Sequence, residues 1–456
     1  MSTQVHAALD EGTVREISES LDEPEWLLET RLEALEALDG LDMPSVIRTP
    51  GREWTNLHDL DFEGFVDPLN AAEDKDQVGP DGVEVLPFAE AVDQHEELVR
   101  EHFGSVVDPQ GNYLTALSTA LFNTGTVVYV PEGVDVGKTP PASSPAHQNA
   151  ERPANAGDVK VRTRMNSRSL FNYTLVVTEE SSSVTILERQ STGEDVEGEA
   201  RSASDSASSA ERRSADSRAA EPRDDGETAS GERYYSGVVE VVAGENSNVQ
   251  YGSLQNLDEE TYNYTLKRGH TDTYATIDWI EGNIGSRLTK SSVETYLKGD
   301  SSESRIVGAF FGHDDQHFDV NARVWHEAEH TTADLVTRGV LNDEARSVYE
   351  GVQDVGSGAW DTSSYQRENT LMLSDESEAD ASPKLIINNH DTEASHSATV
   401  GQVSEEDLFY METRGTDPQS AENMLVEGFF VPVLDEVAVD ELHDDLQDLI
   451  SARLRE

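Results

Sequence analysis

Short runs of alternating apolar and polar residues, separated by Gly, Asn, Asp and Ser, fill the chain from Gly125 to beyond residue 380. Alternation with a period of two predicts half-buried β-strands, and no helical pattern intervenes. Turns at short spacing favour a solenoid in which each coil covers the next, although a sandwich or a barrel also fits. The runs that predict strands are 126–130, 170–177, 184–187, 237–242, 249–251, 274–280, 292–297, 305–311, 318–325, 333–340, 345–352 and 384–387.

Helical patterns precede this region. Residues 13–39 carry an apolar stripe at helical spacing, with Asp22 as an N-cap and Pro24 in the first turn. A second helical stretch covers 88–103, and 114–122 has a mixed pattern. Residues 44–85 are rich in Pro, Gly and Asp and have little periodicity, so we interpret them as a linker-like connection.

Helical patterns also follow it. Ser404 begins a capping box, and Gly415 is a suitable end for the helix that it starts. Residues 417–418, Asp-Pro, begin the next helix, which we expect to end at Gly428. A last helix is predicted over about 439–454. Helical hairpins at the end of a β body are natural docking surfaces for a partner.

These patterns divide the chain into an N-terminal helical region with its linker (1–105), a β core (106–403) and a C-terminal helical domain (404–456). An acidic, Ser-rich insertion at 190–233 interrupts the core, and Val196 is its only large aliphatic residue between 191 and 232. Such a segment buries too little surface to offset its ordering entropy, so we predict a disordered insertion. A regulatory segment is the alternative.

The net charge indicates the solvent environment to which the chain is adapted. The chain has 91 acidic and 33 basic residues, a formal net charge of -58. Molar salt would screen the self-repulsion of such a chain, which indicates adaptation to a salt-rich (halophilic) cytoplasm. A largely disordered acidic protein is the alternative, and the regular apolar strands argue against it. Nucleic-acid binding is disfavoured because neutralising phosphates needs a basic surface.

Three absences narrow the possible classes of protein further: a membrane span, a signal peptide and cysteine. No stretch approaches the ~18 apolar residues of a membrane span, and residues 1–10 lack the basic and apolar regions of a signal peptide. We therefore expect a cytoplasmic protein with no membrane partner. The chain has no cysteine, which excludes disulfides and thiolate metal sites.

The stretch His326-Glu327-Ala328-Glu329-His330 matches the zinc-hydrolase pattern HExxH. That chemistry needs a helix, whereas the flanking residues alternate as in a strand. On a strand, two residues four apart lie ~13 Å apart, too far to chelate one ion. A zinc hydrolase is therefore the minor alternative, and the same argument makes His313 and His317 surface or turn residues. Residues 133–139 narrowly miss a phosphate-binding loop, since three residues instead of four separate the glycines.

His396 is the candidate for metal contact. A lone histidine in a strand is most often structural, but its imidazole is a competent ligand for iron or zinc. It stands in the stretch ASHSATVGQ (394–402), directly before the capped helix that begins at Ser404.

Most of residues 100–456 resembles the SufB/SufD family of iron–sulfur cluster assembly proteins. The stretches that carry the resemblance are RGVLNDEAR (338–346), YEG (349–351), QRENTLMLSD (366–375), EADASP (378–383), HSATVGQ (396–402), LFY (408–410), RG (414–415), EGFF (427–430) and, more weakly, EPEW (23–26) with Arg31. The resemblance implies a right-handed parallel β-helix core flanked by helical regions, and a non-catalytic scaffold rather than an enzyme. A purely structural or adhesive solenoid is a further alternative, and the missing signal peptide and the helical C-terminus argue against it.

The chain is most similar to the SufD branch. It has no cysteine, and Ser397 follows His396 where SufB has a glutamate; Ala394 stands where many SufD chains carry a cysteine. The resemblance implies that His396 contacts a cluster or iron at the interface with SufB. No cofactor would be bound stably, and a transient iron–sulfur cluster or iron would be shared with SufB.

The implied partners are a SufB-like paralogue and a SufC-like ABC-type ATPase, with a homodimer left open for the isolated chain. The ATPase would dock on the C-terminal helices, and its ATP-driven pairing would twist the SufB–SufD interface to expose the assembly site. The residues expected to form this dock, or the packing beneath it, are Leu408, Phe409, Tyr410, Arg414, Gly428 and Phe429.

Overall fold

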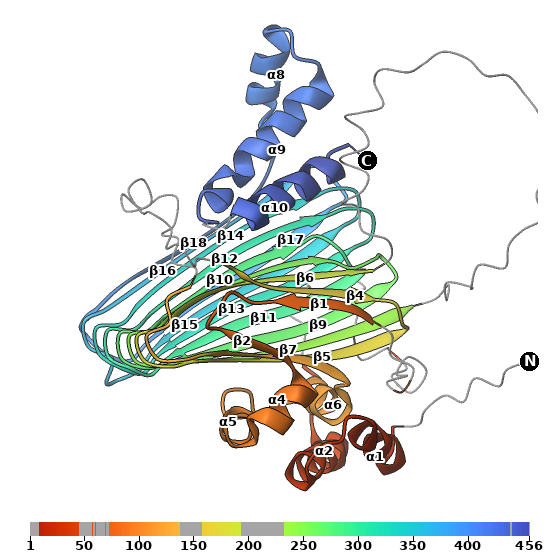
Figure 1. Ribbon diagram of the computed structural model, residues 1–456. Helices are drawn as coiled ribbons and strands as arrows, with labels where there is room; N and C mark the ends of the chain where they lie inside the picture. The colour runs from red at the N-terminus through yellow and green to blue at the C-terminus, as the bar shows by residue number, and fades with distance from the viewer. Residues whose placement is uncertain are drawn as a thin grey trace, which may run out of the picture.

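The chain folds into a β-solenoid with helices at both ends, as the sequence predicted (Figure 1). This computed structural model describes residues 9–44, 73–136, 157–192, 232–437 and 440–455, with the single positions 57, 60 and 69. Residues 193–231, most of the predicted insertion, lie outside the described residues. The ends of that prediction are wrong, because 190–192 complete one strand and Arg233 begins the next.

Two nine-stranded sheets form the walls of the solenoid. Sheet A consists, in spatial order, of β1 (Glu73–Val78), β4 (Val159–Met165), β6 (Ser183–Thr192), β8 (Asn248–Asn256), β10 (Thr276–Asn283), β12 (Glu303–Gly312), β14 (Thr332–Leu341), β16 (Thr362–Met372) and β18 (Thr392–Gln402). Sheet B consists of β2 (Glu84–Pro87), β3 (Thr124–Val130), β5 (Ser169–Thr178), β7 (Arg233–Ala243), β9 (Thr261–Thr271), β11 (Leu288–Leu297), β13 (His317–His326), β15 (Arg346–Val355) and β17 (Glu378–Ile387).

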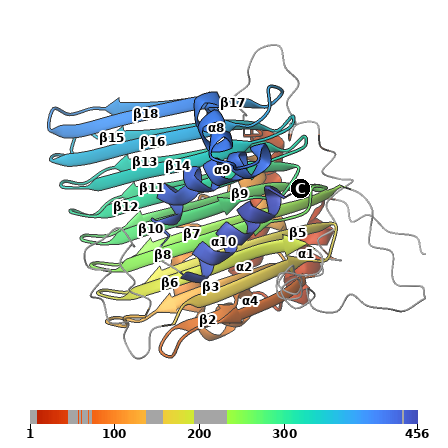
Figure 2. The same cartoon turned by 90° about the horizontal axis from the view of Figure 1, so that it is seen from above.

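Successive strands alternate between the two sheets, so that β5 and β6 form one coil and each following pair forms the next, about seven turns between residues 159 and 402. All pairs within the solenoid are parallel, whereas β1 and β2 add to the first coil as antiparallel strands. In-register parallel pairing stacks equivalent residues of successive coils above one another (Figure 2).

One backbone shape repeats at the corner that leads into sheet A. A non-glycine residue there adopts a left-handed conformation. At the first five of these corners, its N–H donates to the carbonyl of the residue just before the equivalent corner residue of the next coil. Polar residues with short side chains tolerate that conformation best. The corner residues are Ser181, Asn246, Tyr274, Ser301, His330 and Asp361, with φ between 56° and 60°.

Three apolar layers hold the structure together. The interior between the sheets contains fully buried Trp279 and many Val and Ile residues. The outer face of sheet B packs against α1 (Glu11–Ser20), α2 (Glu25–Ala37), η1 (Leu38–Gly40), α4 (Phe88–Gln94), α5 (Glu96–His102) and α6 (Tyr113–Leu121). The outer face of sheet A packs against α9 (Pro418–Leu434) and α10 (Asp440–Arg453), while α8 (Glu405–Thr413) projects from the body (Figure 1).

Several local predictions were wrong. Residues 13–39 form two helices, because Asp22 takes a left-handed conformation (φ 53°) and Pro24 precedes α2. The described part of 44–85 contains β1 and the start of β2, and 113–121 is the buried helix α6. At the other end, α9 continues past Gly428, because Phe430, Val433 and Leu434 bury their side chains against sheet A.

Candidate functional site

The solenoid is open at its C-terminal end, where sheet A ends with β18 and sheet B with β17 (Figure 2). Within the described ranges, no strand pairs with the outer edge of either. Apolar side chains are exposed there, including Ile386 at 43% and Val400 at 39%. Because an edge strand presents unpaired N–H and C=O groups, this end is suited to accept further strands.

His396 lies in the middle of β18 and is exposed at this open end. It is aligned with Gln366 on β16 in parallel register. Residues aligned in this way project from the same face of a sheet, and Gln366 is buried in the solenoid. His396 therefore occupies the inward face of the last strand, where a partner at the open end would cover it.

Three neighbouring residues on the inward face of β16 form a polar row: Ser364, Gln366 and Glu368. At most 1% of each is exposed. They stand opposite Ala394, His396 and Ala398 of β18. In the sequence, Gln366 and Glu368 stood out only as part of a stretch that resembles the family. The signal that could have identified them as site residues is their alternate spacing one coil before His396.

Burial dominates the chemistry of Glu368. Its carboxylate accepts hydrogen bonds from the Thr370 hydroxyl at 2.5 Å and from the backbone N–H of Thr399 on β18. Desolvation outweighs both and raises the pKa of Glu368 to about 7. This carboxylate therefore reaches the last strand from the coil beneath it and changes charge near neutral pH.

The HExxH stretch does not form a zinc site. His326 ends β13 and is buried, its Nδ1 lying 2.8 Å from the Thr331 hydroxyl, and burial lowers its pKa to about 4. His330 lies on the following corner, exposed, with Nδ1 2.8 Å from an Asp361 carboxylate oxygen. The helix that zinc-hydrolase chemistry needs is not formed here, because His326 ends a strand and His330 lies on the corner after it.

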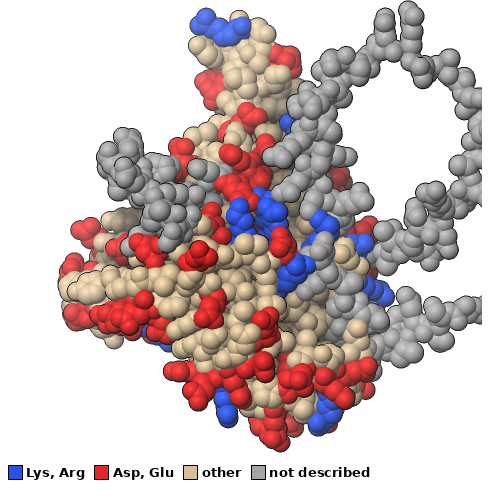
Figure 3. Space-filling model, viewed as in Figure 1, with Lys and Arg blue, Asp and Glu red and all other residues tan. Residues whose placement is uncertain are grey.

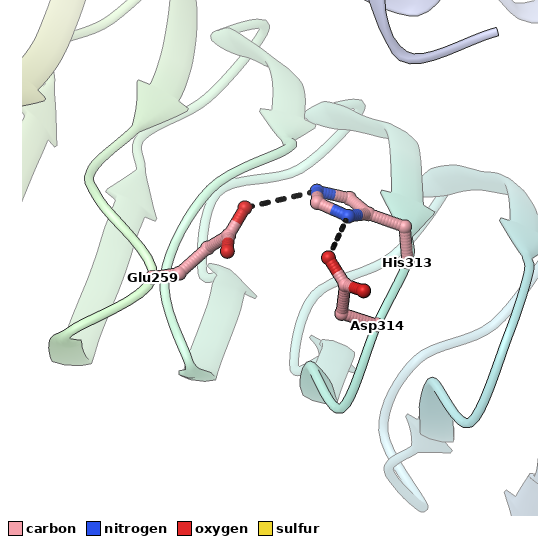
Figure 4. Close-up of side chains that lie close together, drawn as sticks. All are labelled: Glu259, His313 and Asp314. Carbon is pink, nitrogen blue, oxygen red and sulfur yellow. Dashed lines mark hydrogen bonds and ion pairs between the residues drawn. The ribbon is translucent and has the colours of Figure 1, made fainter. Parts of the chain in front are cut away.

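The positions of two further histidines differ from, or add detail to, what the sequence predicted. His317, predicted at the surface, is buried at the start of β13, and burial lowers its pKa to about 4. His313 lies in the turn after β12, with Nε2 3.2 Å from Glu259 and Nδ1 2.9 Å from Asp314 (Figure 4). The two carboxylates approach different ring nitrogens, and one possible ligand atom from each of the three side chains lies within 4.8 Å of the other two.

The near-miss phosphate loop is a turn. Gly133 has a φ of 71°, and its N–H donates to Glu180 of the next coil. Residues 137–139 lie outside the described residues. The described part serves to close a corner of the solenoid.

The predicted dock residues fall into two groups. Phe409 and Tyr410 of α8 are 68% and 59% exposed, Arg414 lies over the Tyr410 ring, and Leu408 is half-buried. Gly428 and Phe429 lie on α9, where Gly428 is exposed and Phe429 packs toward sheet A. The predicted set therefore combines an exposed apolar surface on α8 with a position on α9 that packs against the solenoid.

Acidic side chains cover much of the molecular face in Figure 3, and basic side chains gather below the projecting helices. Three basic residues of β4 and β6 contact Glu441 on α10: Lys160, Arg162 and Arg189. Arg189 also pairs with Asp445. These cations therefore hold α10 on sheet A. Among the described residues, no helix has both the length and the apolar character that a membrane crossing requires.

Comparison with known proteins gives two family matches. Residues 217–429 match the SufBD core domain of SUF-system FeS cluster assembly, and 65–139 match the N-terminal region of SufBD proteins. The chain is 26% identical over 490 residues to the iron–sulfur cluster assembly protein SufD of Bacillus subtilis (strain 168), with 100% of both chains covered. It is equally 26% identical over 483 residues to SufB of the same organism, covering 95% of this chain and 90% of that one. A Staphylococcus epidermidis SufBD family protein is also 26% identical over 483 residues, with the same coverage.

Proposed function

This chain belongs to the SufBD family of iron–sulfur cluster assembly proteins, and from that premise we propose that it is a non-catalytic, SufD-like scaffold subunit. It would pair with a SufB-like paralogue and dock a SufC-like ATPase in the cytoplasm. The iron or cluster is the cargo of this complex and not a resident cofactor. The observation that carries the proposal is an open solenoid end that presents His396 on a chain without any cysteine.

The absence of cysteine supports the SufD-like role over the SufB-like one. Identity does not separate the two, since it is 26% with each Bacillus subtilis protein. A scaffold that offers no thiolate must leave sulfur chemistry to another subunit. In the proposed complex, the SufB-like partner supplies sulfur ligands and this chain supplies His396.

The two final strands support pairing at the open end. A partner solenoid whose own last strands lie against β17 and β18 would extend both sheets at once. It would satisfy the free backbone groups and bury Ile386 and Val400. It would also enclose His396 between the two subunits.

The C-terminal helices support the ATPase dock. Exposed aromatic side chains on a projecting helix are typical of protein interfaces, and α8 presents Phe409 and Tyr410 in this way. The base of α9 is attached to sheet A, where Arg305 of β12 pairs with Glu436 beside the helix end. A force on α8 and α9 would therefore act on the sheet that ends in β18.

The test is an anaerobic pull-down in molar KCl, with this chain as bait for co-expressed SufB-type and SufC-type proteins from the same source. The proposal expects both to be recovered, and the ATPase to be lost when residues 404–456 are deleted. Failure of a folded bait, checked by circular dichroism, to recover either protein would contradict the proposed function.

A further inference from the structure

The polar row on β16 contains three buried oxygens without a hydrogen-bond partner in the described part of the chain. They are Ser364 Oγ, Gln366 Oε1 and Glu368 Oε2. A buried polar atom without a partner costs about 1–3 kcal/mol, and more when it belongs to a charged group. Three such atoms lie in succession on one face of a strand, directly before the open end. They therefore indicate a site that an additional group can occupy.

The arrangement around these atoms leaves room for such a group. The Glu368 carboxylate accepts from the Thr370 hydroxyl through Oε1 and interacts with the Thr399 N–H, while Oε2 itself makes no well-formed hydrogen bond. No Lys or Arg pairs with the carboxylate in the described ranges. Gln366 is fixed through Nε2, 3.5 Å from the Tyr349 hydroxyl, which leaves its Oε1 free as an acceptor. Both neighbours of His396 on the inward face are alanines, 394 and 398.

We propose that Glu368 and His396 are two ligands of one ferrous ion in the mouth of the solenoid, with Gln366 Oε1 beside it as a third oxygen donor. The two side chains lie on adjacent parallel strands and on the same face, two residues apart in register. Neighbours related in this way are close enough for long side chains to reach a common point. This inference rests on the proposed function, which makes iron the metal to expect.

The donor atoms favour an iron ion over a preassembled cluster. Imidazole nitrogen and carboxylate oxygen suit Fe²⁺, whereas iron–sulfur clusters are held mainly by thiolates. This chain offers no thiolate at all. A carboxylate also supplies the negative charge that a divalent ion needs in a buried place. In the part of the chain that the structure describes, no Lys or Arg neutralises the Glu368 carboxylate. In this account the SufD-like subunit presents iron and the partner presents sulfur.

The experiment is anaerobic titration of the full-length chain with ferrous ion in molar KCl, which suppresses loose binding to the acidic surface. Three variants are compared with the unaltered chain: Glu368→Gln, His396→Ala and the control Glu393→Gln. Glu393 lies on β18 in an exposed position that alternates with the inward face, so its variant changes the same charge beside the site. Cobalt(II) absorption gives a second readout of nitrogen and oxygen coordination.

We expect one tight equivalent of Fe²⁺ for the chain and for Glu393→Gln. Removing either ligand should weaken it about tenfold or more, and each variant should change the cobalt spectrum. If Glu368→Gln left the Fe²⁺ affinity and the cobalt spectrum unchanged, the Glu368 carboxylate would not be a ligand and the proposal would be overturned. Glu368→Gln preserves shape and removes a buried charge, and a melting curve beside each titration checks its folding.

The pull-down of the same variants separates this inference from the proposed function. If Glu368→Gln recovers both partners and still binds iron normally, only the ligand assignment fails. If the unaltered chain recovers neither partner, the scaffold role fails whatever the iron titration gives.

Discussion

Arg338 of β14 holds Phe429 of α9 in two ways at once: its Nη1 donates to the Phe429 carbonyl oxygen, and its guanidinium lies 4.8 Å from the centre of the Phe429 ring. The Phe429 ring in turn contacts the buried Phe430 edge to face, 5.8 Å between centroids. Phe429 is therefore an anchor between the solenoid and the proposed ATPase dock.

Phe429→Ala should destabilise the chain by about 1–3 kcal/mol, because it removes a cation–π contact and part of the packing under α9. Loosening of α9 should also weaken ATPase binding. Denaturant unfolding in molar KCl and a pull-down measure the two effects. Met424→Ala, an exposed apolar residue of the same helix, is the matched control for stability. Unchanged stability and unchanged binding would end the assignment of Phe429 to the dock.

The pH dependence of stability should contain a contribution from Glu240 of β7. This fully buried carboxylate accepts hydrogen bonds from the Tyr173 hydroxyl and from the backbone N–H groups of Gly104 and Val107, but burial raises its pKa to about 7. In the unfolded chain it ionises near its usual value of about 4.5, so its contribution is complete below that pH and is lost as pH rises to about 7.

The measurement is unfolding free energy between pH 5 and pH 8 for the chain and for Glu240→Gln, in constant salt. The difference between the two should change by up to about 3 kcal/mol over this range, in the direction that favours Glu240→Gln at high pH. Two parallel curves would show that Glu240 keeps an ordinary pKa.

Lys267 and Glu281 form an ion pair inside the solenoid, with 2.8 Å between the ammonium and the carboxylate. Lys267→Met alone should cost about 3–5 kcal/mol because it leaves a buried carboxylate without its cation. The double change Lys267→Met with Glu281→Leu should recover most of that loss. Denaturant unfolding of the two variants tests this, and equal losses in both would mean that packing volume and not charge is responsible.

The zinc-hydrolase alternative makes an opposite prediction. Because His326 is buried and His330 lies on an exposed corner, His330→Ala should leave metal content unchanged. Elemental analysis of the chain and the variant after dialysis against zinc and then buffer measures this. Stoichiometric zinc that disappears in His330→Ala would revive the alternative.

Alternation predicted the strands because nearly every coil has a buried inner face, and the capping residues Ser404 and Asp417 predicted where α8 and α9 begin. The ends of helices and strands were harder to predict from the sequence. Gly428 is a plausible helix end by itself, and only the tertiary packing of Phe430 against sheet A carries α9 past it. The resemblance to a family identified His396 as a candidate ligand. It did not identify Glu368, because the proposed role of Glu368 follows from its burial and from its alignment with β18, which only the structure shows.

We infer that this chain is a scaffold with two separate docking surfaces, the open solenoid end and α8. Native mass spectrometry of the co-expressed three-protein complex tests it most directly, with two variants of this chain. Val400→Glu places a charge on the inward face of β18, and Phe409→Ala with Tyr410→Ala removes the exposed aromatic surface; Ser397→Glu and Glu412→Gln are the matched controls. We predict that the first variant loses only the SufB-type partner and the second loses only the ATPase. Intact complexes for both variants, or loss of both partners from each, would contradict the claim.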